Sequence, residues 1–114
     1  MTPENVDKLK AINPKLWSIA WPCCGDGWLS VLEALSRKLA EIGPDVVASQ
    51  VKEKFGTLRF YVGGATMDAH EAIHAAERRT ETICETCGEP GKLRTASYWI
   101  YTACDACEAK RNER

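Results

Sequence analysis

Two C-x-x-C pairs near the end of the chain constrain its fold more than any other feature. Cys84 and Cys87 form the first pair, and Cys104 and Cys107 form the second. Two residues between thiolates let a tight turn direct both sulfurs at one ion, and a hairpin brings the second turn opposite to complete a tetrahedron. The spacing therefore predicts a zinc ribbon over residues 84–107, with these four cysteines as the metal ligands.

The residues around the first pair favour the same structure. Gly88 and Gly91 give the backbone freedom that a tight turn needs, and residues 92–94 and 98–102 are expected to form the two strands of the ribbon. Four thiolates leave no coordination position for water, so the expected cofactor is one structural zinc ion that contributes folding free energy. A redox-active C-x-x-C and an iron–sulfur cluster are the alternatives for the same residues.

Charge and the N-terminal sequence narrow the class of protein. The 114 residues include 15 Lys+Arg against 16 Asp+Glu, so there is no global basic field for nucleic-acid phosphates. The first residues are charged where a signal peptide would be apolar, and no apolar run approaches the ~20 residues of a membrane span. We expect a cytoplasmic protein without a membrane partner. Cysteines in that reducing compartment bind metal more often than they form disulfides, so the six cysteines favour a metal site.

Two helices are expected before residue 44. Thr2 is a suitable N-cap for a helix that ends at Asn13, and Asp26 is a suitable N-cap for a second helix that ends at Gly43. The second helix carries an apolar stripe that steps by three and four residues along one face; its members are Trp28, Leu32, Leu35, Leu39 and Ile42. Residues 15–25 between the two helices are expected to be irregular.

A β-hairpin and a third helix complete the expected core. Residues 46–62 predict a hairpin that turns near Phe55 and Gly56, with Phe55 in phase with buried valines, and Thr66 is expected to cap a helix that reaches Ile83. The predicted fold class is α+β. About three helices and a hairpin form a core over residues 1–83, the zinc ribbon over residues 84–107 packs on it, and residues 108–114 form a basic and acidic tail.

The two remaining cysteines suggest a second metal site as one alternative. Cys23 and Cys24 could join His70 and His74, because histidines four residues apart lie on one side of a helix. Adjacent ligands on one backbone constrain tetrahedral geometry, so buried or free thiols are favoured over this site. A cysteine protease would need a base held against the thiol, and no residue in the sequence is placed to provide one.

Three groups of residues are candidates for a partner surface. Basic residues of the hairpin alternate with aromatic ones, which is typical of nucleic-acid binding, although the same alternation fits a solvated strand face. Exposed tryptophans and tyrosines elsewhere could anchor a protein partner. The predicted partner-binding residues are Trp17, Trp21, Lys52, Lys54, Arg59, Tyr98 and Tyr101, with Trp99, Lys92 and Arg94 beside the last two.

Three motifs together resemble a family of small proteins carried by bacteriophages and prophages. They are C-G-D-G-W at residues 24–28, Q-V-K-E-K-F-G-T-L-R-F-Y at residues 50–61, and C-E-x-C-G-x-P-G at residues 84–91 with T-x-C-D-x-C at residues 102–107. The resemblance covers about residues 23–107. It implies a phage or prophage origin, and therefore the host cytoplasm as the location, but no activity. The Cys23–Cys24 pair and the two histidines depart from the family's pattern.

These observations favour a binding protein over an enzyme. The sequence has no phosphate-binding glycine loop, nucleophile elbow or H-E-x-x-H motif. We therefore expect a non-enzymatic, zinc-stabilised accessory protein that binds a host or phage protein. The phage resemblance adds the expectation that it inhibits a host defence or transcription machine. A nucleic-acid-binding zinc-ribbon module is the alternative.

Overall fold

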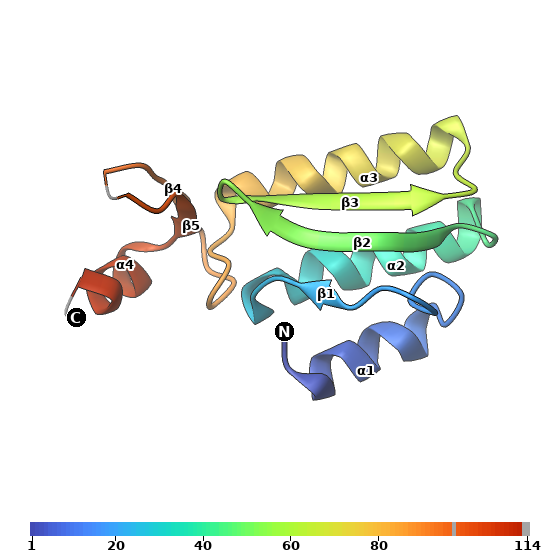
Figure 1. The fold of residues 1–114 in the computed structure, drawn as a ribbon, viewed down its shortest axis with the longest axis horizontal. Helices are drawn as coiled ribbons and strands as arrows, with labels where there is room; N and C mark the ends of the chain where they lie inside the picture. The colour runs from blue at the N-terminus through green and yellow to red at the C-terminus, as the bar shows by residue number, and fades with distance from the viewer. Residues whose placement is uncertain (97, 113–114) are drawn as a thin grey trace.

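The computed structural model describes residues 1–96 and 98–112 and confirms the α+β fold class (Figure 1). Seven elements form the larger part of the molecule: α1 (Pro3–Ile12), β1 (Pro22–Cys23), α2 (Leu29–Ile42), β2 (Val47–Lys54), β3 (Thr57–Gly63), α3 (Met67–Arg79) and the short 3-10 helix η1 (Asp26–Trp28). A C-terminal segment follows, with a second 3-10 helix η2 (Thr80–Thr82), β4 (Lys92–Arg94), β5 (Tyr101–Ala103) and α4 (Asp105–Asn112). No helix of the described chain is long and apolar enough to cross a lipid bilayer.

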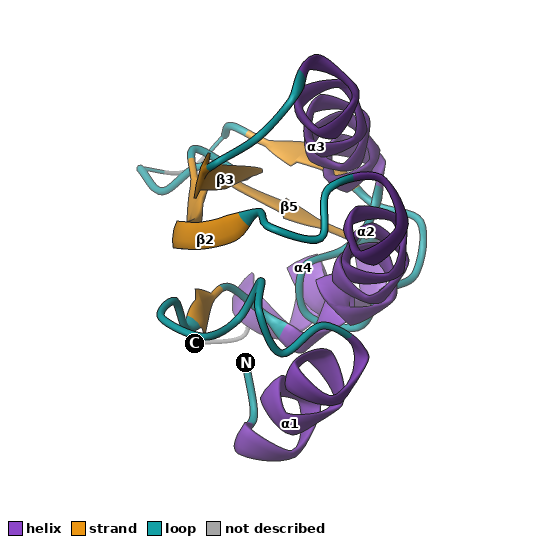
Figure 2. Ribbon diagram, turned by 90° about the vertical axis from the view of Figure 1, so that its right-hand side faces the viewer, coloured by secondary structure: helices purple, strands orange, loops and turns teal. Residues whose placement is uncertain are grey.

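The central sheet has three strands in the order β1, β2, β3. β2 and β3 pair antiparallel, with Val51 opposite Phe60, and β1 adds in parallel to the other side of β2. The hairpin turns at Phe55 and Gly56, whose φ angles of 54° and 84° are those of the tight turn that matches strand twist. α1, α2 and α3 lie on one side of this sheet (Figure 2).

The core lies between the sheet and the helices. The predicted stripe on α2 is confirmed: Leu32, Leu35 and Leu39 are buried, and so is Trp28 immediately before the helix. The indole N–H of Trp17 donates to Ser36 Oγ at 2.9 Å, and its ring meets Phe60 edge-on with centroids 5.7 Å apart. Because Trp17 is only 1% exposed, its prediction as a partner-binding residue is wrong.

Side chains of α3 and η2 cover the free edge of β3. The Phe60 N–H donates to Glu77 Oε2 at 2.9 Å, and the Leu58 N–H donates to Thr80 Oγ1 at 3.2 Å. Unpaired N–H groups at a sheet edge can pair with another chain. Their occupation by Glu77 and Thr80 protects this edge and fixes the third helix against the sheet.

Helix starts agree with the sequence in two cases and differ in one. Thr2 caps α1 and Thr66 caps α3, each through its hydroxyl oxygen. Asp26 does not cap α2, since η1 precedes that helix and Gly25 occupies the cap position of η1. The Asp26 carboxylate instead accepts hydrogen bonds of 2.9 Å from the Thr2 N–H and the Asn5 amide, and so ties the η1 segment to α1.

Four further expectations need correction. Residues 15–25, expected to be irregular, contain β1, a strand of two residues that forms because it pairs with β2. Phe55 is 62% exposed, because the tight turn that it starts projects beyond the core. The second ribbon strand is shorter than residues 98–102 predicted and begins at Tyr101. The expected tail is helical to Asn112 as part of α4, and residues 113–114 lie outside the described residues.

Candidate metal centre

The four cysteines of the two C-x-x-C pairs come together at one point. Their sulfur atoms all lie within 4.8 Å of one another, and those of Cys87 and Cys104 are 3.6 Å apart. Sulfurs bound to one tetrahedral zinc at about 2.3 Å would be about 3.8 Å apart, so only small adjustments separate this cluster from a coordination shell. Cys84, Cys87, Cys104 and Cys107 could therefore bind one metal ion.

Local structure positions both pairs. Cys84 follows η2, and its carbonyl accepts a hydrogen bond of 2.9 Å from the N–H of Gly88, whose φ is +85°. A side chain at that φ is disfavoured, which accounts for the glycine directly after the first pair. Cys104 follows β5, and Cys107 lies in the first turn of α4, where the Cys107 N–H points at the Cys104 sulfur at 3.4 Å.

The cluster contains unequal thiols. Burial raises the pKa of Cys84, but backbone N–H groups of Cys104, Cys87 and Thr86 directed at its sulfur outweigh burial and lower that pKa to about 6. Hydrogen bonding to Cys104, together with burial and the other two sulfurs, raises the pKa of Cys107 to about 12. Four thiolates cannot ionise side by side without a cation, so complete deprotonation requires a bound metal ion.

The first C-x-x-C turn is docked on the C-G-D-G-W segment of the core. The Glu85 carboxylate accepts from the Gly25 N–H at 2.9 Å, and the Glu85 carbonyl accepts from the Gly27 N–H at 2.7 Å. The Trp28 indole donates to the Ile83 carbonyl at 2.9 Å. Burial raises the pKa of Glu85, an effect opposed by the Gly25 N–H. The C-terminal segment that carries the four cysteines is therefore attached to the core by several directed contacts.

The second attachment joins β5 to the tip of the β2–β3 hairpin. Thr102 is buried, and its hydroxyl donates to the Gly56 carbonyl at 2.6 Å. The Thr102 carbonyl accepts from the Glu85 N–H at 3.1 Å. The hairpin tip, β5 and the first cysteine turn are thus connected through one residue.

Contacts within the segment hold α4 against the strands. Arg94 forms a salt bridge to Asp105 at 2.8 Å and lies 3.7 Å from Glu108. The Tyr101 hydroxyl donates to Glu108, and Arg111 stacks over the Tyr101 ring at 3.8 Å. Tyr101 is 4% exposed, so its prediction as a partner-binding residue is wrong. Its function in the structure is to pack the second cysteine pair.

The other predicted partner residues remain accessible. Trp21 and Tyr98 are exposed, Lys54 is exposed, and Lys52 and Arg59 are half-buried on the sheet. Around the hairpin tip, Tyr98 and Trp99 approach Phe55 and line a hollow of about 430 Å³ together with Glu53, Lys54 and Ile100. We call Phe55, Tyr98 and Trp99 the aromatic patch.

The structure does not assemble the second metal site. Among the described residues, the four-cysteine cluster is the one group of three or more metal-binding side chains close enough to share an ion. His70 and His74 lie side by side on α3 with ring centroids 6.4 Å apart, and Cys23 and Cys24 do not join them. Cys24 packs in the core and Cys23 is exposed, which is the arrangement favoured by the sequence.

Glu85 and Thr102 are functional residues of this centre that the sequence analysis missed. Neither is a metal ligand, so spacing rules cannot find them. The sequence did contain one signal, the pair of glycines around Asp26. A Cβ on Gly25 would lie 2.3 Å from the Glu85 carbonyl oxygen, and a Cβ on Gly27 would lie 2.2 Å from the Cys84 carbonyl oxygen. Two glycines so placed indicate the close approach of another backbone.

Comparisons with known proteins found no relative of this chain. No family model matches the chain, and neither the curated proteins nor the solved structures give a match. The arguments below therefore depend on the sequence and the geometry of this molecule.

Proposed function

We propose that this protein is a non-enzymatic binding module, that one structural zinc ion holds its C-terminal segment, and that the aromatic patch is the contact surface for a protein partner. The phage resemblance of its motifs supports a further element of the proposal. This further part of the proposal is that the protein is a phage-type accessory factor in the host cytoplasm, where it binds a host or phage protein and inhibits a defence or transcription machine.

The donor set supports zinc as the bound ion. Four cysteines with their sulfurs gathered within 4.8 Å are the ligand set of structural zinc sites, and the small β4–β5–α4 segment buries few apolar side chains of its own. The four protein ligands leave no position at which a substrate could bind the ion. This ligand count supports a structural and non-catalytic metal.

The exposed aromatic patch is the observation that carries the protein-binding proposal. Tyr98 is fully exposed, Trp99 is 63% exposed, and Phe55 adds a third large ring from a different part of the chain. Tyrosine and tryptophan are enriched among residues that dominate binding energy at protein interfaces. The Thr102–Gly56 hydrogen bond fixes the hairpin tip against β5, so part of this surface is organised before binding.

A pull-down from host lysate tests this proposal. Tagged protein is compared with the Phe55→Ala/Tyr98→Ala variant, and both are treated with nuclease before elution. The proposal expects a defined protein that survives nuclease treatment and that binds the variant at least about 30-fold less tightly, because two central aromatics at about 1–2 kcal/mol each contribute about 2–4 kcal/mol together. Recombinant partner is then titrated against both proteins by calorimetry.

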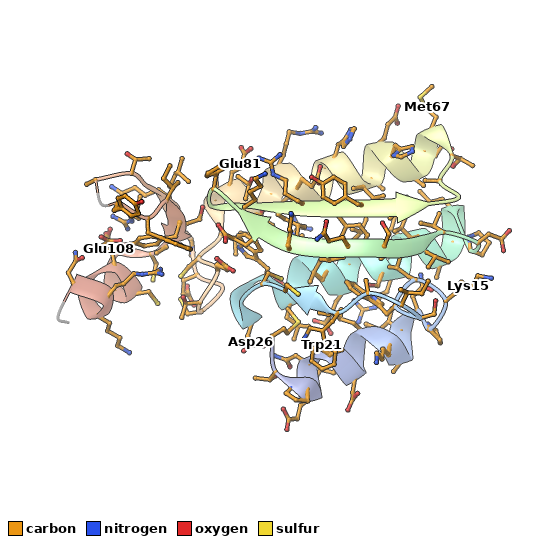
Figure 3. All side chains as sticks on the ribbon, in the orientation of Figure 1. Lys15, Trp21, Asp26, Met67, Glu81 and Glu108 are labelled. Atoms are coloured by element: carbon orange, nitrogen blue, oxygen red, sulfur yellow. The ribbon has the colours of Figure 1, made fainter. Side chains whose placement is uncertain are left out.

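Met67→Ala provides the matched control. Met67 is a large apolar side chain as exposed as those of the patch, but it lies at the opposite end of the molecule from α4 (Figure 3). Its replacement should leave capture unchanged. Equal loss of capture with Met67→Ala, or equal capture by the patch variant, would show that the aromatic patch is not the contact surface.

A further inference from the structure

The outer face of the three-stranded sheet carries no covering element of the described chain, since α1, α2 and α3 all lie on the opposite side (Figure 2). Strand pairing defines its residues, because paired residues point to the same side of a sheet. Cys23, Lys52 and Arg59 form one row across all three strands. Gln50 with Tyr61, and Lys54 with Thr57, form the rows on either side. We refer to these seven residues as the outer face.

The outer face has only positive charge. Lys52, Lys54 and Arg59 occupy it, and none of its seven residues is acidic. Glu53 belongs to the other side of β2, where its carboxylate accepts from the Gly56 N–H at 2.7 Å. Within the described residues, none of the three cations forms a salt bridge. On a chain with a net charge of -1, this is a local concentration of unpaired positive charge.

Aromatic rings border these cations. Tyr61 stands in the row beside Arg59 and is 47% exposed, and Trp21, which directly precedes β1, is exposed to the same extent. Lys54 lies over the Phe55 ring at 5.5 Å, whereas Trp21 is contacted by Lys10 of α1 and lies at the border of the face. Flat rings next to basic side chains are what single-stranded nucleic acids require, because bases stack while phosphates are neutralised.

Arg59 has an unmet hydrogen-bonding requirement. Its Nε is shielded from solvent and has no acceptor in the described structure. A guanidinium binds phosphate oxygens with two parallel N–H groups, and a buried donor without a partner is rare in folded proteins. A small movement toward a phosphate placed over the row of Lys52 and Arg59 would satisfy this donor.

We propose that the outer face binds single-stranded nucleic acid, with Lys52, Lys54 and Arg59 on the phosphates and Tyr61 stacked on a base. The three cations outside any salt bridge, with no acidic residue among the seven of the outer face, favour a polyanion over an apolar partner, although Glu77 and Glu81 border the face beside Arg59. The exposed Tyr61 favours unpaired bases over a duplex. This binding does not require the protein partner, although the two surfaces meet at Lys54, which lines the hollow of the aromatic patch and lies over the Phe55 ring. An acidic protein is the competing occupant and is distinguished by the test.

Fluorescence anisotropy with a labelled oligothymidylate of about 12 nucleotides tests the proposal, with the matched duplex as a second probe. We expect a dissociation constant on the order of micromolar at about 50 mM salt. About three phosphate contacts imply a loss of about 20-fold in affinity on raising salt to about 200 mM. Lys52→Ala/Arg59→Ala should remove most of that salt dependence, and Tyr61→Ala should weaken binding about 5-fold or more, while Tyr61→Phe should not.

Arg37→Ala/Lys38→Ala is the matched control, because it removes the same charge from exposed positions of α2 on the helical side of the molecule. Thermal melts of every variant confirm that it is folded. Binding lost equally in this control would overturn the proposal, since it would show attraction to net charge alone. Absence of oligonucleotide binding by folded wild-type protein, or salt-sensitive binding of an acidic polyglutamate peptide in its place, would also overturn it.

Discussion

The Glu85 carboxylate accepts a hydrogen bond of 2.9 Å from the backbone N–H of Gly25, across 60 residues of sequence. The backbone carbonyl of the same glutamate accepts from the Gly27 N–H at 2.7 Å. Glu85 lies between the two cysteines of the first pair, so any ion that orders this turn also orders a face of the core. A metal ion bound here would therefore stabilise the contact between the cysteine turn and the core. Its loss should destabilise structure beyond residues 84–107.

Purified protein should contain one zinc ion, and Cys84→Ser should lose it. Removing one thiolate breaks a four-ligand site whose binding free energy is also folding free energy, on the order of 10 kcal/mol in small zinc domains. Native mass spectrometry reads the metal content, and elemental analysis distinguishes zinc from iron. Cys23→Ser is the control, because Cys23 is exposed and lies outside the cluster. Well-folded, metal-free wild-type protein would contradict this prediction.

Leu35→Ala should destabilise the domain by about 2–5 kcal/mol, because it opens a cavity in the middle of the buried stripe on α2. Urea denaturation followed by circular dichroism measures the change in unfolding free energy. Lys38→Ala on the exposed side of the same helix should change it by no more than about 0.5 kcal/mol. A loss under about 1 kcal/mol for Leu35→Ala would show that the stripe is not core.

Periodicity predicted the helices and the hairpin well because those patterns report burial along one element. The stripe of α2 and the turn at Phe55 and Gly56 are local properties, and both are confirmed. Cysteine spacing predicted the cluster for the same reason, since each pair lies within a single turn. Zinc itself remains a prediction.

Properties that depend on distant partners could not be predicted. By residue type, Tyr101 and Trp17 are suitable anchors for a partner. Both are buried, because Tyr101 packs under Arg111 and Trp17 binds Ser36, and the sequence alone does not show these contacts. β1 has two residues, too few for any periodic pattern, and exists because β2 offers it hydrogen bonds. Asp26 is a suitable cap by residue type, but its carboxylate accepts from the Thr2 N–H and the Asn5 amide at the start of α1 instead.

Cys23 and Cys24 should differ strongly in reactivity although they are neighbours. Burial, with the nearby Glu85 charge, raises the pKa of Cys24 to about 12, so at pH 8 only about one in ten thousand Cys24 side chains is the reactive thiolate. Cys23 is exposed. Brief treatment of native zinc-loaded protein with iodoacetamide should label Cys23 alone, as read by peptide mass spectrometry. Labelling of Cys24 at a rate similar to that of Cys23 would contradict the burial of this thiol.

Gly27→Ala should detach the first cysteine turn from the core without removing the metal. A Cβ on Gly27 would lie 2.2 Å from the Cys84 carbonyl oxygen and 2.6 Å from the Glu85 carbonyl carbon. Both are backbone atoms, which cannot rotate away as a side chain would, so the contact between the two segments must open. Forced overpacking of this kind costs about 1–3 kcal/mol, and here it also removes the hydrogen bond from Gly27 to Glu85.

Gly63→Ala separates this effect from the general cost of replacing a glycine. A Cβ on Gly63 would meet no atom within 4 Å, so the free energy of unfolding of that variant should be close to that of the wild type. Hydrogen exchange read by mass spectrometry should show faster exchange at residues 83–91 in Gly27→Ala only, with one metal ion still bound. Equal exchange in the two variants would mean that Glu85 and the C-G-D-G-W segment do not couple the metal centre to the core. Loss of the metal with Gly27→Ala would mean instead that the ligands need this contact to assemble.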